Sequence, residues 1–148
     1  DEGHIRPMCF YGAQGMGLRA DNLKTHCIVA AWEWPSYMSP EAFEDGIKIK
    51  ISSYKRQTNN LVSRSKVNGN YVTSIMALQE AMQEGYDEAL LLDDENNISE
   101  GSGENLFLVK DETLYTPDLA ASLNGITRKS IISLAEEDEI KVVVKKIN

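Results

Sequence analysis

The hydrophobic pattern of the first third of the chain is typical of β-strands. Residues 5–11 and 26–32 are rich in apolar and β-branched side chains, which predicts two strands. The segment 12–17 between them contains three glycines and predicts a flexible turn. The segment 34–40 contains two prolines, so we expect a linker there.

Strands and helices are expected to interleave after residue 46. Residues 47–51 alternate strictly between isoleucine and lysine, which predicts a half-buried strand. Residues 71–84 form the clearest predicted helix, and Gly85 is expected to end it. The apolar positions at helical spacing in this segment are Tyr71, Ile75, Leu78 and Met82.

The rest of the chain continues this alternation. The further predicted elements are a short helix at 40–45, a buried strand at 88–92, a hairpin formed by 105–109 and 114–116, a helix at 127–137 and a strand at 141–146. We expect Ser39 and Thr127 to cap the two helices. In the second of them, Ile131, Leu134 and Ala135 are expected to face inward. Interleaved strands and helices favour an α/β fold.

Composition narrows the classes of protein to consider. The chain has 148 residues, of which 42% are hydrophobic and 26% charged, and this is ordinary globular usage. No apolar run has the length of a membrane span, so we expect no membrane partner. The formal net charge of −8 leaves no basic surplus to neutralise phosphates, which argues against nucleic acid as a partner.

The cysteines and histidines do not form a metal-binding pattern. Cys9 and Cys27 lack zinc spacing, and His4 and His26 are isolated, so we expect no metal site. We expect the two cysteines to be reduced, buried thiols of a cytoplasmic protein. A disulfide between adjacent strands is the alternative.

Three polar stretches have a composition that packing alone does not require: 66–71, 99–105 and 123–128. Taken singly, each stretch has a purely structural explanation. The first would be a solvated lysine before a turn, the second a glycine-rich acidic loop, and the third the start of a helix. Together they supply a lysine for a Schiff base, a carboxylate, and a helix N-terminus with a threonine hydroxyl. These groups match the aldehyde, the pyridine nitrogen and the phosphate of pyridoxal 5'-phosphate.

The same stretches resemble the class IV pyridoxal-phosphate aminotransferases. Residues 100–107, 114–116 and 123–128 match the long signature of that class with its internal spacing. Within the class, the chain is most similar to the branched-chain amino acid aminotransferases. The segments that support this are 5–7, 30–34, 66–71 and 85–89.

The resemblance implies roles around the cofactor ring. Lys66 matches the lysine that holds the cofactor aldehyde as a Schiff base and then moves the substrate proton. Glu100 matches the carboxylate that faces the pyridine nitrogen, and Tyr71 the phenol that hydrogen-bonds the ring oxygen. Leu123 would pack on the ring face, while Ile126 and Thr127 would bind the phosphate.

The resemblance also implies substrate contacts in the first segment. Arg6 matches an arginine that meets the side-chain carboxylate of glutamate, which a guanidinium can bind bidentately. Met16, Leu18 and Trp34 match apolar positions that wall the side-chain pocket. Without the resemblance, ordinary packing or a surface strand would explain these residues equally well.

The expected organisation follows from the same resemblance. The fold is that of the type IV pyridoxal-phosphate enzymes, with residues 1–37 as the last strands and linker of a small α+β domain. Residues 38–148 would form the larger part of a mixed-sheet α/β cofactor domain. Family members build the site near a subunit interface, which implies a homodimer or higher homo-oligomer. The expected location is the cytoplasm, in line with the reduced cysteines.

We expect the chain to be the middle of a longer enzyme, because it begins without Met and ends directly after an apolar stretch. The family's phosphate-binding arginine would lie upstream, and a glycine-threonine turn downstream. We therefore expect little or no turnover by this chain alone. Two residues depart from the family pattern. His4 stands where tyrosine is frequent, and Asn68 stands where a small residue is usual.

The predicted function is transamination of branched-chain L-amino acids (leucine, isoleucine, valine) with 2-oxoglutarate or glutamate. Two alternatives share the fold: a D-amino acid aminotransferase and an aminodeoxychorismate lyase. A third is a non-catalytic module that kept the fold. The set of Lys66, Tyr71, Glu100 and Thr127 argues against the third, because a module without chemistry has no need for it.

Overall fold

A computed structural model describes residues 3–34, 38–58 and 64–148 of the chain. The chain divides into two compact units, Asp1–Gly46 and Ile47–Asn148, which we call unit 1 and unit 2. Strands and helices are mixed throughout, in agreement with the predicted α/β class. The domain assignment 1–37 and 38–148 stays a prediction. No helix among the described residues is long and apolar enough to cross a membrane.

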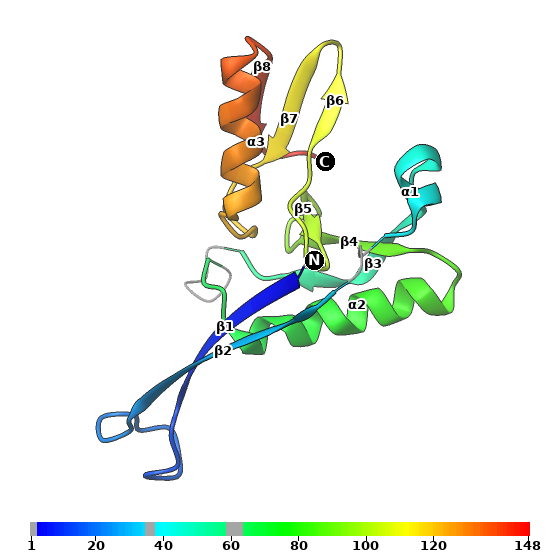
Figure 1. Cartoon of the computed structure of the whole chain (residues 1–148). Helices are drawn as coiled ribbons and strands as arrows, with labels where there is room; N and C mark the ends of the chain where they lie inside the picture. The colour runs from blue at the N-terminus through cyan, green and yellow to red at the C-terminus, as the bar shows by residue number, and fades with distance from the viewer. Residues whose placement is uncertain (1–2, 35–37, 59–63) are drawn as a thin grey trace. The chain divides into compact units, whose positions relative to one another are not determined.

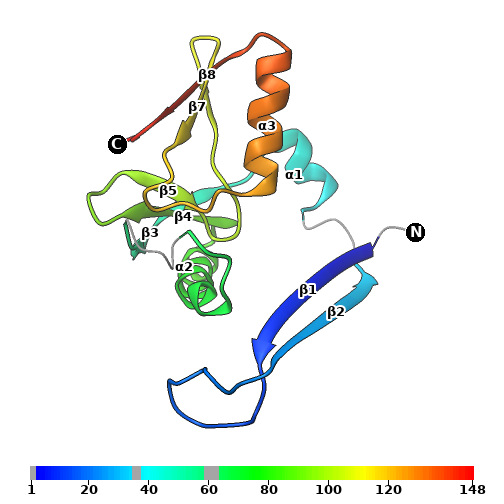
Figure 2. The same cartoon turned by 90° about the vertical axis from the view of Figure 1, so that its left-hand side faces the viewer.

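Unit 1 is built on a two-stranded antiparallel ribbon of β1 (Gly3–Tyr11) and β2 (Thr25–Glu33) (Figure 1). The ribbon is long and twisted, and a loop connects the two strands at one end (Figure 2). The short helix α1 (Pro40–Asp45) follows. Ser39 caps it as predicted, since its side chain accepts a hydrogen bond from the Ala42 N–H at 3.4 Å.

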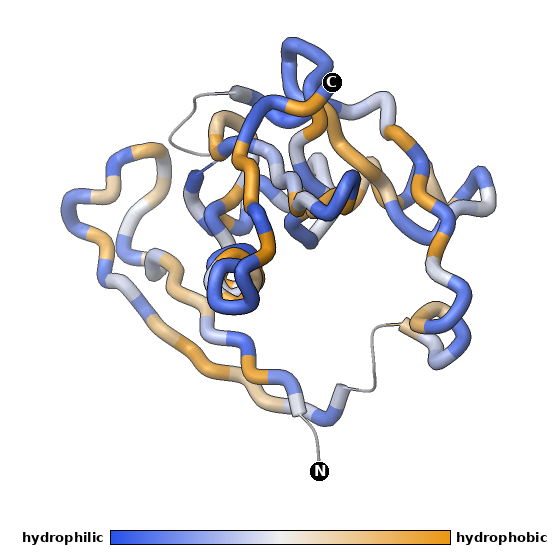
Figure 3. The backbone as a smooth tube through the Cα atoms, turned by 90° about the horizontal axis from the view of Figure 1, so that it is seen from above, coloured by the Kyte–Doolittle hydropathy of each residue, from blue (hydrophilic) through white to orange (hydrophobic). Residues whose placement is uncertain are grey.

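The expected burial of the two cysteines is wrong. Cys9 and Cys27 lie directly opposite each other on β1 and β2, and both are exposed free thiols. Figure 3 shows hydrophobic residues along the ribbon, yet none of the described side chains of unit 1 is buried. The physical reason is that a two-stranded ribbon has no second layer of its own to cover either face.

Unit 2 begins with a three-stranded sheet in the order β3-β4-β5, formed by β3 (Ile49–Arg56), β4 (Glu88–Asp93) and β5 (Ile98–Gly101). The strands β3 and β4 are parallel, whereas β4 and β5 are antiparallel. A parallel pair requires a crossover, and the helix α2 (Tyr71–Gln83) provides it after a short 3-10 turn, η1 (Asn68–Asn70). The helix runs along the sheet in Figure 1.

Small side chains form the core between this helix and the sheet. Ala77 and Ala81 of α2 lie one turn apart, and they pack with Ala89 and Leu91 of β4. All four are fully buried, and Tyr54 of β3 packs against them. Alanine at both helix positions lets the helix backbone approach the sheet closely.

The predicted apolar face of α2 is therefore shifted. Ile75 and Met82 are more than half exposed, whereas the buried helix positions are Ser74, Ala77 and Ala81. The spacing correctly predicts the helix. It does not identify the buried stripe, because the close approach of the backbone selects small residues over large ones.

A second sheet has the order β6-β7-β8 and consists of β6 (Leu108–Lys110), β7 (Thr113–Pro117) and β8 (Lys141–Lys145). The predicted hairpin is confirmed, and both turn residues, Asp111 and Glu112, have positive φ values of 49° and 55°. Two such residues are typical of a type I′ turn. The helix α3 (Ile126–Glu137) connects the parallel strands β7 and β8 and lies beside them (Figures 1 and 2).

Three local predictions need correction. The acidic stretch 99–105, expected as a loop, begins within β5. Leu134 is 59% exposed although we expected it to face inward, while Ala135 is buried as expected. The N-cap of α3 is Gly125 rather than Thr127, since the helix begins at Ile126.

Candidate active site

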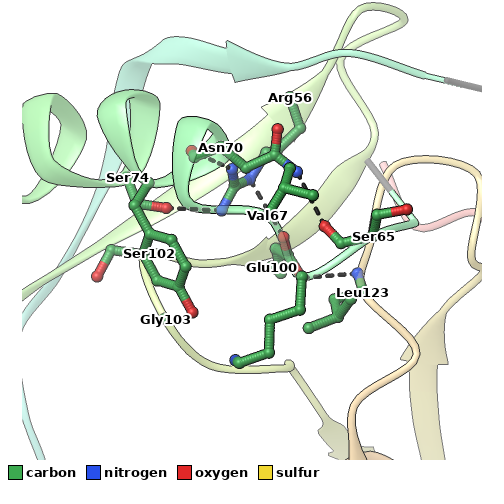
Figure 4. Close-up of a pocket in the computed structure, with 11 residues that line it drawn as sticks. Arg56, Ser65, Val67, Asn70, Ser74, Glu100, Ser102, Gly103 and Leu123 are labelled. Carbon is green, nitrogen blue, oxygen red and sulfur yellow. Dashed lines mark hydrogen bonds and ion pairs between the residues drawn. The ribbon is translucent and has the colours of Figure 1, made fainter. Parts of the chain in front are cut away.

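A pocket in unit 2 brings together Lys66, Tyr71, Glu100 and Leu123, four of the six residues predicted to hold a cofactor. They come from the turn before α2, the first residue of that helix, the strand β5, and the segment before α3. Figure 4 shows this pocket, with Glu100 close to Arg56 and to Leu123. The site therefore joins segments that are up to 57 residues apart in the sequence (Lys66 to Leu123).

Lys66 lies in a short turn between β3 and α2. The Val67 N–H donates to the Ser65 carbonyl at 2.9 Å, which closes the turn around Lys66. The Lys66 Nζ atom lies 5.7 Å from the centre of the Tyr71 ring, within the range of a cation–π contact. Lys66 is exposed, and Tyr71 is 37% exposed. An accessible amine thus stands beside a phenol at the mouth of the pocket.

Glu100 is the buried charge of the pocket, with only 8% of its surface exposed. Its Oε1 atom lies 3.1 Å from Arg56 Nε, and its Oε2 atom accepts a hydrogen bond from the Leu123 N–H at 3.0 Å. Burial raises the pKa of Glu100, while the Leu123 N–H and the charges of Arg56 and Lys66 act in the opposite direction. A carboxylate in this position can pair with a cationic group placed in the pocket.

Two serines hold the segment before α3 against β5. The Ser99 hydroxyl donates to the Ala121 carbonyl at 2.9 Å, and the Ser122 hydroxyl donates to the Ser99 carbonyl at 3.0 Å. Both serines are buried. These bonds fix Leu123 next to Glu100.

Asn105 and Gly125 form a second fixed contact in the same place. The Asn105 side-chain amide donates to the Leu123 carbonyl at 2.8 Å. A Cβ atom at Gly125 would lie 2.3 Å from the Asn105 Oδ1 atom, so any other residue there would force the Asn105 side chain to move. The signature residues Asn105 and Gly125 therefore have a structural role that can be stated from their geometry.

Ile126 and Thr127 lie outside the residues that line the pocket. They are the first two residues of α3, and both are exposed. Gly125 has no side chain that could cap the helix, so the first backbone N–H groups of α3 have no hydrogen-bond partner within the helix. Such an N-terminus can bind an anion.

The four predicted substrate residues all belong to unit 1. Arg6 is on β1, and its guanidinium carbon lies 5.9 Å from the centre of the Trp32 ring. Trp34 packs its ring at 5.1 Å from His4 and 5.4 Å from Trp32. Met16 and Leu18 are fully exposed in the loop between the strands.

The sequence prediction missed several residues of the pocket, and Arg56 is the most important of them. Arg56, Asn70 and Ser74 line the pocket, and the last two accept hydrogen bonds from the Arg56 guanidinium. The alternating pattern predicts a strand at 47–51, but β3 extends to Arg56. A charged residue at the end of a strand and before a polar loop was the available signal.

Comparison with known proteins identifies the family of this chain. The family model of the class IV aminotransferases matches residues 1–148. A branched-chain-amino-acid aminotransferase of Pseudomonas aeruginosa is 52% identical, over 99% of this chain and 48% of the length of that protein.

Solved structures give the same relationship. The crystal structure of the Escherichia coli branched-chain amino acid aminotransferase matches with a TM-score of 0.93 and 42% identity, over 99% of this chain and 49% of that one. The T.th. branched-chain amino acid aminotransferase, solved with pyridoxamine 5'-phosphate, matches with a TM-score of 0.91 and 40% identity, over 99% and 48%.

This chain thus spans about half the length of the relatives it matches. The match runs along the whole of the chain, and it includes the pocket with Lys66, Tyr71 and Glu100. The chain belongs to the class IV aminotransferase family.

Proposed function

We propose that the complete protein carrying this chain is a pyridoxal-phosphate-dependent aminotransferase of branched-chain L-amino acids, with 2-oxoglutarate as the amino acceptor. The observation that carries the proposal is the pocket of unit 2, in which an amine, a phenol and a buried carboxylate stand together. The relatives that match this chain over nearly its full length are named for that activity.

The residues of the pocket fit pyridoxal phosphate by their chemistry. The amine of Lys66 matches an aldehyde, the carboxylate of Glu100 matches a protonated pyridine nitrogen, and the phenol of Tyr71 matches the ring oxygen. The side chain of Leu123 offers an apolar surface to a ring. The buried Nε atom of Arg56 lies 3.1 Å from Glu100 Oε1, although it is not aligned for a hydrogen bond with any described residue.

Bound pyridoxal phosphate would supply an aldehyde that reacts with amines and a ring that accepts electrons from the substrate carbon. Lys66 would hold the cofactor covalently and, once released, would carry the proton at its Nζ atom. The flexible stem of lysine suits this transfer because it can reach two neighbouring atoms without moving the backbone.

Glu100 would set the charge of the ring. An ionised carboxylate keeps a facing pyridine nitrogen protonated, and the N–H of Leu123 and the charge of Arg56 favour the ionised form of Glu100. Tyr71 would orient the ring through its hydroxyl group. Glu100 and Tyr71 can act in this way only if they keep fixed positions relative to the ring. The hydrogen bonds around Leu123 hold this part of the pocket in place.

The N-terminus of α3 would hold the phosphate. Ile126 would contribute its backbone N–H, and Thr127 its N–H and hydroxyl. Both residues follow Leu123 closely in the sequence, so one segment would supply the ring contact and the phosphate contact.

Unit 1 would supply the substrate side. Arg6 would bind the distal carboxylate of glutamate or 2-oxoglutarate, and Met16, Leu18 and Trp34 would line the space for branched side chains. A homo-oligomer and a cytoplasmic location complete the proposal. The family's use of subunit interfaces supports the homo-oligomer.

Covalent trapping tests the proposed function directly. The complete protein is incubated with pyridoxal phosphate, reduced with borohydride and digested, and the modified peptide is identified by mass spectrometry. We expect a visible absorption band before reduction and a single label on Lys66. Lys66→Ala should lose both, while Lys110→Ala, which changes an exposed lysine of β6, should keep both. A label on another residue, or none in the complete protein, overturns the proposal.

The substrate is tested with a panel. L-leucine, D-alanine and aminodeoxychorismate are each offered to the loaded protein, and the 2-oxo acid products are measured. We expect turnover of L-leucine with 2-oxoglutarate. Preference for D-alanine would indicate a D-amino acid aminotransferase, and release of pyruvate from aminodeoxychorismate a lyase.

A further inference from the structure

Arg56 lies where three elements of the site meet. It is the last residue of β3, and only 14% of its side chain is exposed. Its Nη1 atom donates to the Asn70 carbonyl at 3.2 Å, and its Nη2 atom donates to the Ser74 hydroxyl at 2.7 Å. Its Nε atom lies 3.1 Å from Glu100 Oε1. One planar guanidinium therefore connects β3, the start of α2 and β5, which a lysine could not do.

The contact with Glu100 is electrostatic rather than a saturated hydrogen bond. The Arg56 Nε atom is close to the Glu100 oxygen but has no aligned hydrogen-bond partner among the described residues. The other Glu100 oxygen is occupied by the Leu123 N–H. The charge of Arg56 and the Leu123 N–H thus hold the two oxygens of the carboxylate from different sides.

Burial alone would favour the neutral form of Glu100. Burial raises the pKa of its carboxyl group, and the opposing influences are the Leu123 N–H, Arg56 and Lys66. Burial also raises the pKa of Glu104, in the segment after β5, and the neighbouring carboxyl groups of Glu88 and Glu100 raise it further, while the Gly103 N–H lowers it. Since Lys66 is exposed and is itself the proposed reacting amine, Arg56 is the permanent cation of this group.

Arg56 is also linked to the turn that carries Lys66. It donates to the carbonyl of Asn70, whose side-chain amide donates to the Ser65 carbonyl at 3.1 Å. Ser65 directly precedes Lys66 and accepts the hydrogen bond of the Val67 N–H. Two consecutive hydrogen bonds therefore connect the guanidinium with the carbonyl that directly precedes Lys66, and a third connects that carbonyl with the residue after it.

We propose that Arg56 is a positioning residue of the site, which fixes the Glu100 carboxylate and the Lys66 turn relative to each other. It acts through these two residues and not on the reacting atoms. The inference rests on the proposed function, because Glu100 and Lys66 have their roles only there. It predicts that substitutions at position 56 can distinguish the effect of the positive charge from the effect of the planar guanidinium with its several N–H donors.

The test uses Arg56→Gln and Arg56→Lys in the complete protein loaded with pyridoxal phosphate. For Arg56→Gln, we expect kcat for L-leucine to fall roughly 10- to 100-fold, the loss typical of one charge-assisted contact. We also expect the pH midpoint of the visible cofactor band to shift, because Glu100 takes up a proton more easily. Arg56→Lys should return the pH midpoint of the band most of the way to that of the unchanged protein but restore little of kcat, because lysine returns the charge without the planar guanidinium.

Two further variants keep the test decisive. Ser74→Ala removes the hydrogen bond from Arg56 Nη2 without changing any charge. We therefore expect a smaller loss of kcat than for Arg56→Gln and an unchanged pH midpoint of the cofactor band. Arg64→Gln, an exposed arginine two residues before Lys66, should behave as the unchanged protein. Thermal unfolding of each variant shows whether it is folded.

A double-mutant cycle with Glu100→Gln completes the experiment. If Arg56 acts through Glu100, Arg56→Gln should change the cofactor band little when Glu100 is already neutral. A folded Arg56→Gln protein with normal band, normal pH midpoint and normal kcat overturns the inference while Lys66 is still labelled by borohydride. Failure to label Lys66 in the unchanged protein would instead overturn the proposed function.

Discussion

Unit 2 and unit 1 differ in how their candidate site residues are held. In unit 2, Glu100 and Arg56 have little exposed surface, and contacts of about 3 Å tie them to neighbouring elements. In unit 1, Arg6 and Trp34 stand on or beside an exposed two-stranded ribbon, and their described contacts are aromatic. A ribbon of this kind has little stability of its own.

Under the proposed function, this difference in packing corresponds to a difference in role, with the cofactor residues in unit 2 and the substrate residues in unit 1. A group that must keep its charge and position during a reaction needs a rigid surrounding, which the sheet and helix of unit 2 provide. A group that selects substrates can be carried by a ribbon that other parts of the protein support. Changes in unit 2 should therefore act on the cofactor and on kcat, whereas changes in unit 1 should act on KM.

The largest effect is expected for Glu100→Gln. The substitution keeps the shape and the hydrogen bond from Leu123 but removes the charge that, under the proposed function, would face the ring nitrogen. We expect kcat to fall on the order of 100-fold, as for the loss of one preorganised electrostatic contact, with KM for L-leucine little changed. Steady-state kinetics of the complete enzyme measures this. Glu112→Gln, in the exposed hairpin turn, serves as the control, and a Glu100→Gln variant with normal kcat would refute the role of Glu100.

Gly125→Ala should disturb the site through its backbone. The new Cβ would meet the Asn105 Oδ1 atom at 2.3 Å, so Asn105 must move and release the Leu123 carbonyl. We expect a loss of about 1–3 kcal/mol in the free energy of unfolding, the usual cost of overpacking. Urea denaturation checks this. Gly69→Ala, where a Cβ meets nothing within 4 Å, is the matched control, and equal stability of the two variants would contradict the prediction.

Arg6→Ala tests the substrate side. Under the proposed function, the distal carboxylate of 2-oxoglutarate would lose a charge-assisted pair without the guanidinium, and we expect the KM for 2-oxoglutarate to rise roughly 10-fold. The half-reaction with L-leucine, which has no such carboxylate, should keep its rate. Single-turnover measurements of both half-reactions separate the two effects. Arg19→Ala removes an exposed arginine of unit 1 that pairs with Asp21, and it should leave both half-reactions unchanged.

Much of the fold is accessible from the sequence because local patterns carry it. The helix α2 follows from its spacing, and the hairpin around Asp111 and Glu112 from two apolar runs and a polar turn. The candidate site is accessible for another reason. The signature around Glu100 and Leu123 is long and has fixed internal spacing, and the structure brings Lys66 to the same pocket.

What could not be predicted depends on contacts between distant segments. The last residues of β3, from Ser52 to Arg56, are mostly polar, and the register shifts between Ile51 and Lys55, so no alternation marks the strand. Arg56 can be recognised as a residue of the site only in the folded chain, where β5 brings Glu100 beside it. Likewise, α2 buries Ala77 and Ala81 because the sheet lies close to them, which no one-dimensional pattern contains.

The smallest expected effect concerns Glu80, which joins α2 to β3 within unit 2. Its carboxylate accepts hydrogen bonds from the Ser52 hydroxyl at 2.6 Å and the Ser53 N–H at 3.0 Å, and these lower its pKa from 4.5 to about 2. A lowered pKa in the folded state means that the stabilisation is present above the ordinary pKa value and is lost as the pH falls toward 2.

Glu80→Gln should therefore be less stable than the unchanged protein near neutral pH, and the difference in the free energy of unfolding should shrink on acidification. Urea denaturation over this range measures it. Glu136→Gln, on an exposed face of α3, is the matched control for the loss of a carboxylate from a helix. If the Glu80→Gln difference persists down to about pH 2, the carboxylate does not hold α2 on β3 by its charge.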